Sequence, residues 1–150
     1  MNNAIFNIER PKNEKVHSYS PGTRERKALN SELNRLSGEV QDIPLIIGGK
    51  EVRTGDTGTV VMPHDHGHVL ARYHKAGEKE VKMAIDAALK AHREWSETPW
   101  VERVSINMKA AELLARKHRF LINASTMLGQ GKNAYQAEID AACETIDFLN

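Results

Sequence analysis

The fold is decided by the closing stretch of the chain, Thr126-Met-Leu-Gly-Gln-Gly-Lys-Asn-Ala-Tyr-Gln-Ala-Glu-Ile-Asp-Ala-Ala-Cys-Glu-Thr-Ile-Asp-Phe-Leu-Asn150. Gly129 and Gly131 can supply the left-handed backbone that ends one helix. Asn133, with Gln136 three residues later, can cap the next helix. The stretch therefore predicts two helices joined by a glycine turn.

The second of these helices has an apolar stripe and an acidic surface. Its apolar residues recur at steps of four and three, as in a helix that packs on a core. They are Tyr135, Ile139, Ala142, Ile146 and Leu149. The acidic residues are Glu138, Asp140, Glu144 and Asp147. No Lys or Arg follows Lys132, so this helix supplies no basic partner for its own carboxylates.

Glu144 is the candidate binding residue of this helix. It lies one helical turn from Ala141 and Phe148, and the small side chain of Ala141 leaves space beside it. A carboxylate that is partly removed from water needs a cationic partner or several hydrogen bonds. That partner has to come from outside the helix. The alternative is an ordinary solvated position, because Glu is almost never fully buried without a partner.

The composition is that of a globular domain. A chain of 150 residues, 40% of them hydrophobic, can bury about two-thirds of its unfolded surface. The 21 basic and 20 acidic residues nearly balance, which argues against nucleic acid or an anionic membrane as a partner. No apolar run approaches the roughly 20 residues of a membrane span.

The single cysteine, Cys143, bears on both compartment and chemistry. One cysteine cannot form an internal disulfide, and it suits a reducing compartment. The N-terminus has neither the apolar core of a signal peptide nor the Arg-rich character of a transit peptide. A cytoplasmic protein is therefore expected. No His or Lys lies three or four positions from Cys143, which favours a packing role over a nucleophilic one.

The chain divides into four segments. Residues 1–22 have no sustained period and predict an extended arm that lies on another surface. Residues 23–42 predict a helix, because leucines recur along one side, with Ser37-Gly38 as a candidate stop inside this range. Residues 43–75 predict a small β-meander, because short apolar runs alternate with Gly and Pro turns. Residues 76–150 predict helices that continue beyond residue 150, since the last apolar stripe has no stop signal.

The helical segment has three features of note. Its first helix has a strong apolar stripe of Val81, Ala84, Ile85, Ala88, Leu89 and His92. Thr98 can cap the next helix with Pro99 at its first position, and Trp95 and Trp100 are expected to anchor a core or interface. The basic run Arg116–Arg119 predicts a helix end, where cations meet the negative pole of the dipole.

A metal site in the loop Pro63–His68 is the most tempting alternative function. His64, His66 and His68 alternate with other residues and could share one face of a strand. A closed site needs a fourth ligand and hydrogen-bonded support, which this spacing does not supply. We therefore predict no metal and interpret the loop as a polar turn. Gly129 to Lys132 likewise lacks the full spacing of a phosphate-binding loop.

Three runs resemble the aldehyde dehydrogenase family and, within it, the pyrroline-5-carboxylate dehydrogenases. They are Pro63-His-Asp-His-Gly-His68, Met127-Leu-Gly-Gln-Gly-Lys132 and Gln136-Ala-Glu-Ile-Asp-Ala-Ala-Cys-Glu-Thr-Ile-Asp-Phe148. The resemblance covers about residues 22–150 and is most specific in the last third. It implies an α/β fold, in which this chain is the N-terminal part: a small β-meander plus amphipathic helices that flank a Rossmann-like NAD-binding domain.

The resemblance also implies a function. The chain would be the N-terminal segment of an NAD-dependent dehydrogenase, a homo-oligomer that oxidises glutamate semialdehyde to glutamate in proline catabolism. In this family the catalytic cysteine, the general base and the NAD site lie downstream, so no catalytic or cofactor residue is assigned within residues 1–150 and this segment alone is expected to be inactive. Glu144 takes the place of a family glutamate that faces the amino group of the substrate. The alternative is a stand-alone helical module, without catalysis, whose acidic last helix docks a basic protein.

Overall fold

The fold is taken from a computed structural model that describes residues 10–150, so the first nine residues of the expected arm lie outside it. The helices are α1 (Arg24–Gly38), α2 (Glu78–Glu97), α3 (Trp100–Leu113), α4 (Arg119–Gln130), α5 (Ala134–Ala137) and α6 (Glu144–Leu149), with π-helical segments η1 (Leu114–His118) and η2 (Glu138–Cys143). The strands are β1 (Gln41–Ile43), β2 (Leu45–Ile47), β3 (Lys50–Val52), β4 (Thr57–Met62) and β5 (Asp65–His74). The expected mixture of helices and strands is confirmed.

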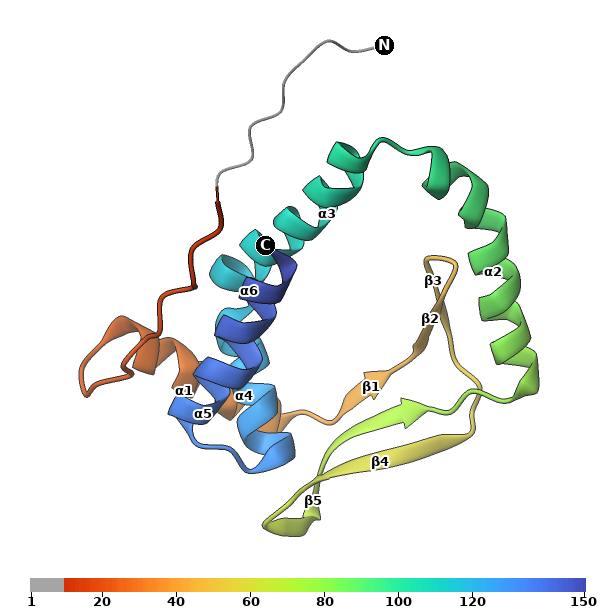
Figure 1. The fold of residues 1–150 in the computed structure, drawn as a ribbon. Helices are drawn as coiled ribbons and strands as arrows, with labels where there is room; N and C mark the ends of the chain where they lie inside the picture. The colour runs from red at the N-terminus through yellow and green to blue at the C-terminus, as the bar shows by residue number, and fades with distance from the viewer. Residues whose placement is uncertain (1–9) are drawn as a thin grey trace.

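The elements follow an open curve (Figure 1). The chain passes from α1 through the strands to α2, and α3 then leads back to α4, α5 and α6. Helices α1 and α4 pack on each other, and α6 packs on α3. One end of the molecule is therefore a helical bundle, whereas α2 lies at the other end beside the β2–β3 hairpin.

The strands do not form the expected meander. One sheet has the order β1-β5-β4, in which β1 pairs parallel with β5, and β2 pairs only with β3 in a separate hairpin. Pro44 explains the difference, because proline lacks the N–H that a continuous strand would use, and it divides the apolar run between two sheets. The hairpin turns at Gly48 and Gly49, whose φ values of 57° and 77° suit a two-residue turn.

The turn after β4 is shorter than the sequence predicts. Strand β5 begins at Asp65, so only Pro63 and His64 of the expected loop form the turn. Asp65 accepts a hydrogen bond from the backbone N–H of Gly67 at 3.1 Å, and the register of the strand pair shifts next to Val61. A bulge of this kind lets a polar segment stay in the ladder while its twist changes.

Two helix ends also differ from the predictions. The helix expected over residues 23–42 ends at its candidate stop, Gly38, and not at residue 42, because Gln41 and the two residues after it pair with β5 instead. Thr98 does not cap α3: its hydroxyl donates back to the Glu94 carbonyl at 2.8 Å, and Pro99 is the capping residue. In the first case backbone groups pair with a strand, and in the second the Thr98 hydroxyl bonds to its own helix, so neither forms the contact that the sequence pattern predicts.

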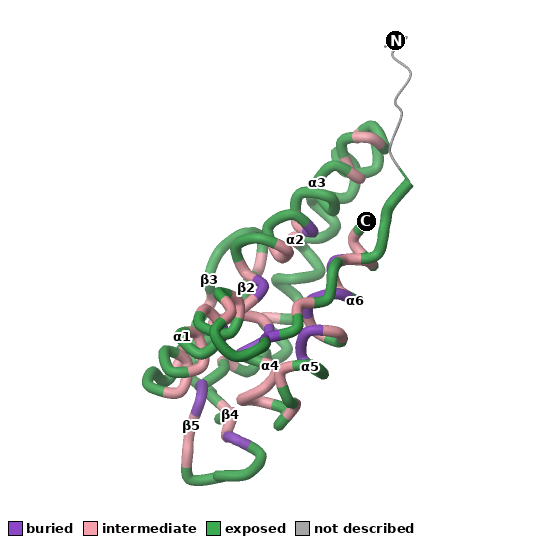
Figure 2. Tube along the Cα trace, turned by 90° about the vertical axis from the view of Figure 1, so that its left-hand side faces the viewer, coloured by how far each residue is buried: buried purple, intermediate pink, exposed green. Residues whose placement is uncertain are grey.

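The core includes two small clusters in the helical bundle, and Met62, Leu70 and Ala71 of β4 and β5 are also buried, as the purple segments of Figure 2 indicate. In the first, Tyr19 of the arm packs with Leu29 of α1 and Ala124 of α4. In the second, Ala111 packs with Ala142 and Ile146. The arm therefore lies on helices of its own chain, and the second cluster joins α3 to the η2–α6 segment.

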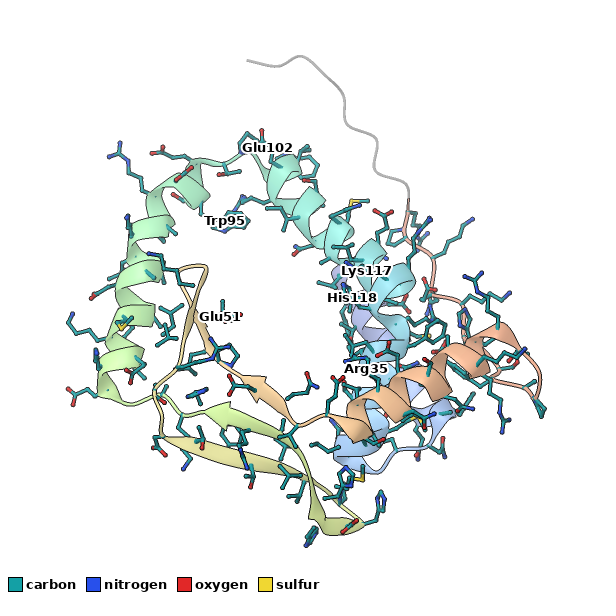
Figure 3. The ribbon with its side chains drawn as sticks, turned by 180° about the vertical axis from the view of Figure 1, so that it is seen from behind. Arg35, Glu51, Trp95, Glu102, Lys117 and His118 are labelled. Atoms are coloured by element: carbon teal, nitrogen blue, oxygen red, sulfur yellow. The ribbon has the colours of Figure 1, made fainter. Side chains whose placement is uncertain are left out.

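Helix α2 has no share in this core. It is a regular 20-residue helix, yet none of its residues is buried. Leu89 in the middle of its apolar stripe is 69% exposed, and Trp95 is 48% exposed. In Figure 3 the Trp95 side chain extends from α2 toward the inside of the curve. The predicted stripe is present, but within residues 10–150 it is not covered.

Candidate functional site

Glu144 is the first residue of α6 and its side chain is exposed. Its backbone N–H donates to the carbonyl of Ile139, five residues earlier, and so closes the last turn of η2. Across residues 10–150 the Glu144 carboxylate forms no ion pair, in contrast to Glu138 and Asp140. The carboxylate is therefore free to meet a cationic group that this segment does not supply.

An exposed aromatic residue accompanies Glu144. Phe148 follows it by four positions in α6, so the two side chains share one face of the helix. Phe148 is 86% exposed, the highest value among the large apolar residues described. A carboxylate beside an apolar ring can bind a ligand or a protein segment that presents an ammonium group together with hydrocarbon. Without a partner, such an arrangement exposes apolar surface at a cost.

The wide turn before Glu144 depends on a buried carboxylate. Glu138, the first residue of η2, is 0% exposed. Its Oε2 accepts hydrogen bonds from the Tyr19 hydroxyl at 2.6 Å and from Asn123 Nδ2 at 2.7 Å. Its Oε1 accepts from the backbone N–H of His17 at 2.7 Å. With Arg119 as ionic partner, the buried charge is fully paired, which is the condition for burying a carboxylate at all.

Arg119 is the centre of this cluster and is 1% exposed. Its Nε and Nη2 donate to Glu138 Oε1 at 3.1 and 2.5 Å. Nη1 donates to Glu14 Oε1, and Nη2 also donates to the Lys15 carbonyl, both at 2.6 Å. Nη2 lies 3.4 Å from the Cys143 sulfur. One guanidinium thus joins the arm, α4 and both ends of η2.

These contacts shift three pKa values. Burial alone would raise the pKa of Glu138, but hydrogen bonds from Arg119, Tyr19 and His17 outweigh it and lower the pKa below its usual value. Burial also works against the charged form of Arg119, yet Glu138 and Glu14 raise its pKa. Burial raises the pKa of the Cys143 thiol. The ion pair is therefore charged at neutral pH, and Cys143 is a buried neutral thiol that suits packing better than nucleophilic attack.

Sequence reasoning missed this cluster. The run Arg116–Arg119 does not end a helix, because α3, η1 and α4 follow one another without a break. Arg119 points into the core, and Glu138 belongs to the inner face of its helix with Ala137 and Ala142, whereas Tyr135 of the predicted stripe is 63% exposed. A signal was available: Ala134 and Ala142 lie four positions before and four positions after Glu138, and small residues at such positions leave room for a buried side chain.

The histidines of the β4–β5 turn do not come together as a metal site. His64 and His66 are exposed, and the Nε2 of His68 lies 2.9 Å from the Ser37 carbonyl oxygen. Over residues 10–150, no group of three or more His, Cys, Asp or Glu side chains is arranged to hold a metal ion. His68 therefore helps to attach β5 to the end of α1.

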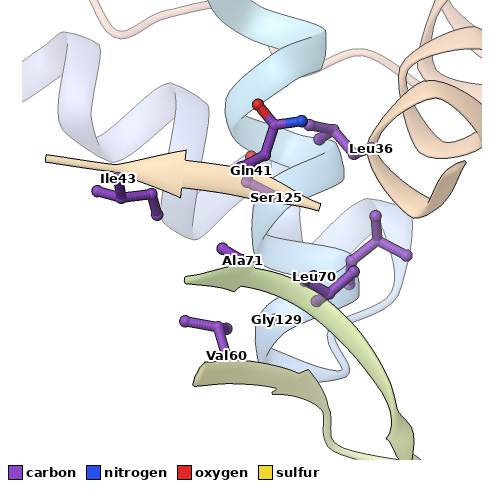
Figure 4. Close-up of a pocket in the computed structure, with 9 residues that line it drawn as sticks. Leu36, Gln41, Ile43, Val60, Leu70, Ala71, Ser125 and Gly129 are labelled. Carbon is purple, nitrogen blue, oxygen red and sulfur yellow. The ribbon is translucent and has the colours of Figure 1, made fainter. Parts of the chain in front are cut away.

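An apolar pocket lies between the sheet and the helices (Figure 4). It is lined by Leu36, Gln41, Ile43, Val60, Leu70, Ala71, Ser125, Leu128 and Gly129. No charged side chain lines it. Without an acid, a base or a cation the pocket has no means of catalysis, and it adds no candidate residue to Glu144.

Comparison with known proteins identifies the family to which this chain belongs. The family model described as "Aldehyde dehydrogenase family" matches residues 51–150. The chain belongs to the aldehyde dehydrogenase family. A probable delta-1-pyrroline-5-carboxylate dehydrogenase of Schizosaccharomyces pombe is 44% identical over 147 residues, which cover 97% of this chain and 27% of that protein. The mitochondrial delta-1-pyrroline-5-carboxylate dehydrogenase of Homo sapiens is 44% identical over 91% of this chain and 24% of its own length.

Solved structures give the same result for this aldehyde dehydrogenase segment. The delta-pyrroline-5-carboxylate dehydrogenase of Mycobacterium tuberculosis, solved with NAD bound, matches with a TM-score of 0.94 and 42% identity. The match covers 98% of this chain and 28% of that one. The chain thus spans about a quarter of the length of these relatives, and its fold is their N-terminal part, as expected. Within residues 10–150 no helix combines the length and apolar character needed to cross a membrane.

Proposed function

We propose that this chain is the N-terminal segment of an NAD-dependent dehydrogenase that oxidises glutamate semialdehyde, formed from pyrroline-5-carboxylate, to glutamate in proline catabolism. The names of relatives that are 42–44% identical over nearly all of the segment support this proposal. The segment contributes the arm, the small sheet and the helices that surround the NAD-binding domain, and alone it is inactive.

Within this function, Glu144 binds the α-ammonium group of the substrate. The observation that carries the assignment is an exposed carboxylate without an ionic partner in the described chain, beside the exposed Phe148 ring. A charge-assisted hydrogen bond from an ammonium group to this carboxylate would separate glutamate semialdehyde from simple aldehydes. The ring would cover the hydrocarbon part of the ligand.

NAD supplies the hydride acceptor of the reaction, and we assign it no residue of this segment. The nearest approach to a nucleotide turn is the passage from β5 through Gly77 to α2. There the Glu80 carboxylate accepts a hydrogen bond from the Gly77 N–H at 3.0 Å. A carboxylate at the helix start opposes a phosphate, which would otherwise favour that position. The cofactor site and the catalytic cysteine and base are therefore expected downstream.

The test is Glu144→Gln in the full-length dehydrogenase. The loss of one charged hydrogen bond, about 1.5 to 3 kcal/mol, should lower kcat/KM for glutamate semialdehyde about 10- to 150-fold, mainly through KM. With propanal, which has no ammonium group, the change should stay below about twofold. Asp140→Asn, on the same helix but paired with Lys132 at 2.7 Å, is the matched control. Equal losses on both aldehydes would mean damage to the helix and would refute the assignment.

The alternative of a stand-alone interaction module has less support. A self-contained domain would cover the apolar stripe of α2, and α2 has no buried residue. Expression of residues 1–150 alone separates the two hypotheses. Aggregation or a molten state would favour the segment, and a monodisperse, cooperatively unfolding domain would favour the module.

Two further parts of the proposal concern assembly and location. We propose a homo-oligomer, to be tested by light scattering of the full-length enzyme. A cytoplasmic location fits the single cysteine, but the relatives from Homo sapiens and Dictyostelium discoideum are named as mitochondrial. Cell fractionation with a mitochondrial marker decides between the two compartments.

A further inference from the structure

The buried ion pair and Glu144 belong to the same short piece of helix. Segment η2 begins at Glu138 and ends at Cys143, and Glu144 follows directly. The Arg119 guanidinium contacts both ends of this segment, with Nη2 2.5 Å from Glu138 Oε1 and 3.4 Å from the Cys143 sulfur. The buried ion pair therefore holds the η2 turn at both ends, and Glu144, the proposed substrate ligand, follows that turn directly.

A π turn decides where the following residues point. It inserts one extra residue into an α-helix, and such insertions are frequent at functional sites. One residue of an α-helix corresponds to about 100° of rotation and about 1.5 Å of rise. If η2 relaxed to regular α-helix, Glu144 would turn by about that angle relative to α5.

The N-terminal arm adds further contacts to this ion pair. Glu14, Lys15, His17 and Tyr19 all bond to Arg119 or Glu138, although more than 100 positions separate them from those residues along the chain. Asp147, one turn after Glu144, accepts from the backbone N–H of Glu14 at 2.7 Å. The arm is thus attached both before and after Glu144.

We propose that Arg119 and Glu138, closed over by the arm residue Tyr19, are positioning residues that hold the η2 turn and thereby aim Glu144 at the substrate ammonium group. This inference rests on the proposed function of Glu144. It makes the N-terminal arm part of the structure that selects the substrate.

The test uses the full-length enzyme and compares glutamate semialdehyde with propanal. Glu138→Gln keeps the shape of the side chain but removes its charge. The KM for glutamate semialdehyde should rise about tenfold, while kcat and the KM for propanal change less than about twofold. Asp140→Asn, in the same turn but on its exposed side, should leave both KM values within about twofold. A purely structural role would lower the melting temperature without changing the preference between the two aldehydes.

Tyr19→Phe is a second, milder variant that tests the same role if Glu138→Gln does not fold. It keeps the ring and removes one hydrogen bond, so the KM for glutamate semialdehyde should rise about threefold. The double variant Glu138→Gln/Glu144→Gln should be no worse than Glu144→Gln alone, since the first residue acts through the second. Additive effects, or equal effects on both aldehydes, overturn the positioning role.

The outcomes also separate this inference from the proposed function. If Glu144→Gln changes the preference but Glu138→Gln and Tyr19→Phe do not, only the positioning role is wrong. If Glu144→Gln leaves the preference unchanged, the substrate assignment is wrong and the positioning role falls with it.

Discussion

Helix α2 and the η2–α6 segment differ in how well their apolar faces are buried. The α2 stripe follows the helical period closely, yet Val81, Ile85 and Leu89 are all at least half exposed. The buried face of η2–α6 contains an acidic residue, yet it is well covered: Ala142 and Ile146 are 1% and 2% exposed, and Glu138 is 0% exposed. The better packed of the two segments is the one whose buried face contains a carboxylate.

The difference shows how much a periodic apolar pattern can predict about packing. It identifies the face of a helix that has to be covered, but it does not name the element that covers it. The η2–α6 segment is covered by the arm, α3 and α4, which all belong to residues 10–150. The proposed function offers a cover for α2, namely the part of the dehydrogenase that lies outside this segment.

The strongest test of the well-packed region is Arg119→Ala. This change leaves Glu138 buried without its ionic partner, which should cost about 3 to 5 kcal/mol. Amide hydrogen exchange in the full-length enzyme should show the loss locally, at the backbone N–H groups of Glu14 and His17, which bond to Asp147 and Glu138. Arg116→Ala is the control, because Arg116 is 81% exposed and 3.8 Å from its partner. A loss below about 1 kcal/mol would show that Arg119 is dispensable for packing.

The next largest effect concerns α2. Leu89→Ala should cost about 2 to 4 kcal/mol in the full-length enzyme if the rest of the protein covers this face. If α2 stays uncovered, the same change should cost less than about 0.5 kcal/mol, because Leu and Ala have similar helix propensities. Chemical denaturation of the full-length enzyme measures the cost, with Lys82→Ala on the solvent side as control. A cost as small as that of the control would mean that α2 stays uncovered in the enzyme.

The two regions also show how far sequence reasoning reaches. Local signals were reliable: the capping box of Asn133 and Gln136, the glycine turn before it and the helix whose stripe begins at Val81 are all confirmed. Features that depend on distant partners were not visible. No local pattern indicates that β1 pairs with β5 rather than with its neighbour, and only the folded arm makes Arg119 and Glu138 core residues. Glu144 was singled out by the space beside it and the lack of a basic partner on its own helix, the family resemblance then gave it a role, and that role stays a prediction.

Acid should weaken the η2 region more than α2. The pKa of Glu138 is lower in the folded state than its usual 4.5. The ionised carboxylate therefore stabilises the folded state fully above about that pH, and this stability is lost as pH falls through the lower folded value. Unfolding free energies of the wild type measured between about pH 7 and pH 3 should fall more steeply than those of Glu138→Gln. Parallel curves for the two proteins would contradict the assigned pKa shift.

The smallest effects come from the two glycines between α4 and α5, and they should have opposite signs. Gly131 has a φ of 70° and caps α4, so Gly131→Ala should cost about 1 kcal/mol. Gly129 lies inside α4, and a Cβ added there meets no atom within 4 Å, so Gly129→Ala should add about 0.5 to 1 kcal/mol of stability. The sequence alone treats both as possible caps, whereas the backbone uses only one. Thermal unfolding of the two variants decides the matter: stabilisation by alanine at position 131 would place the end of α4 elsewhere, and with it the start of the η2–α6 segment that presents Glu144.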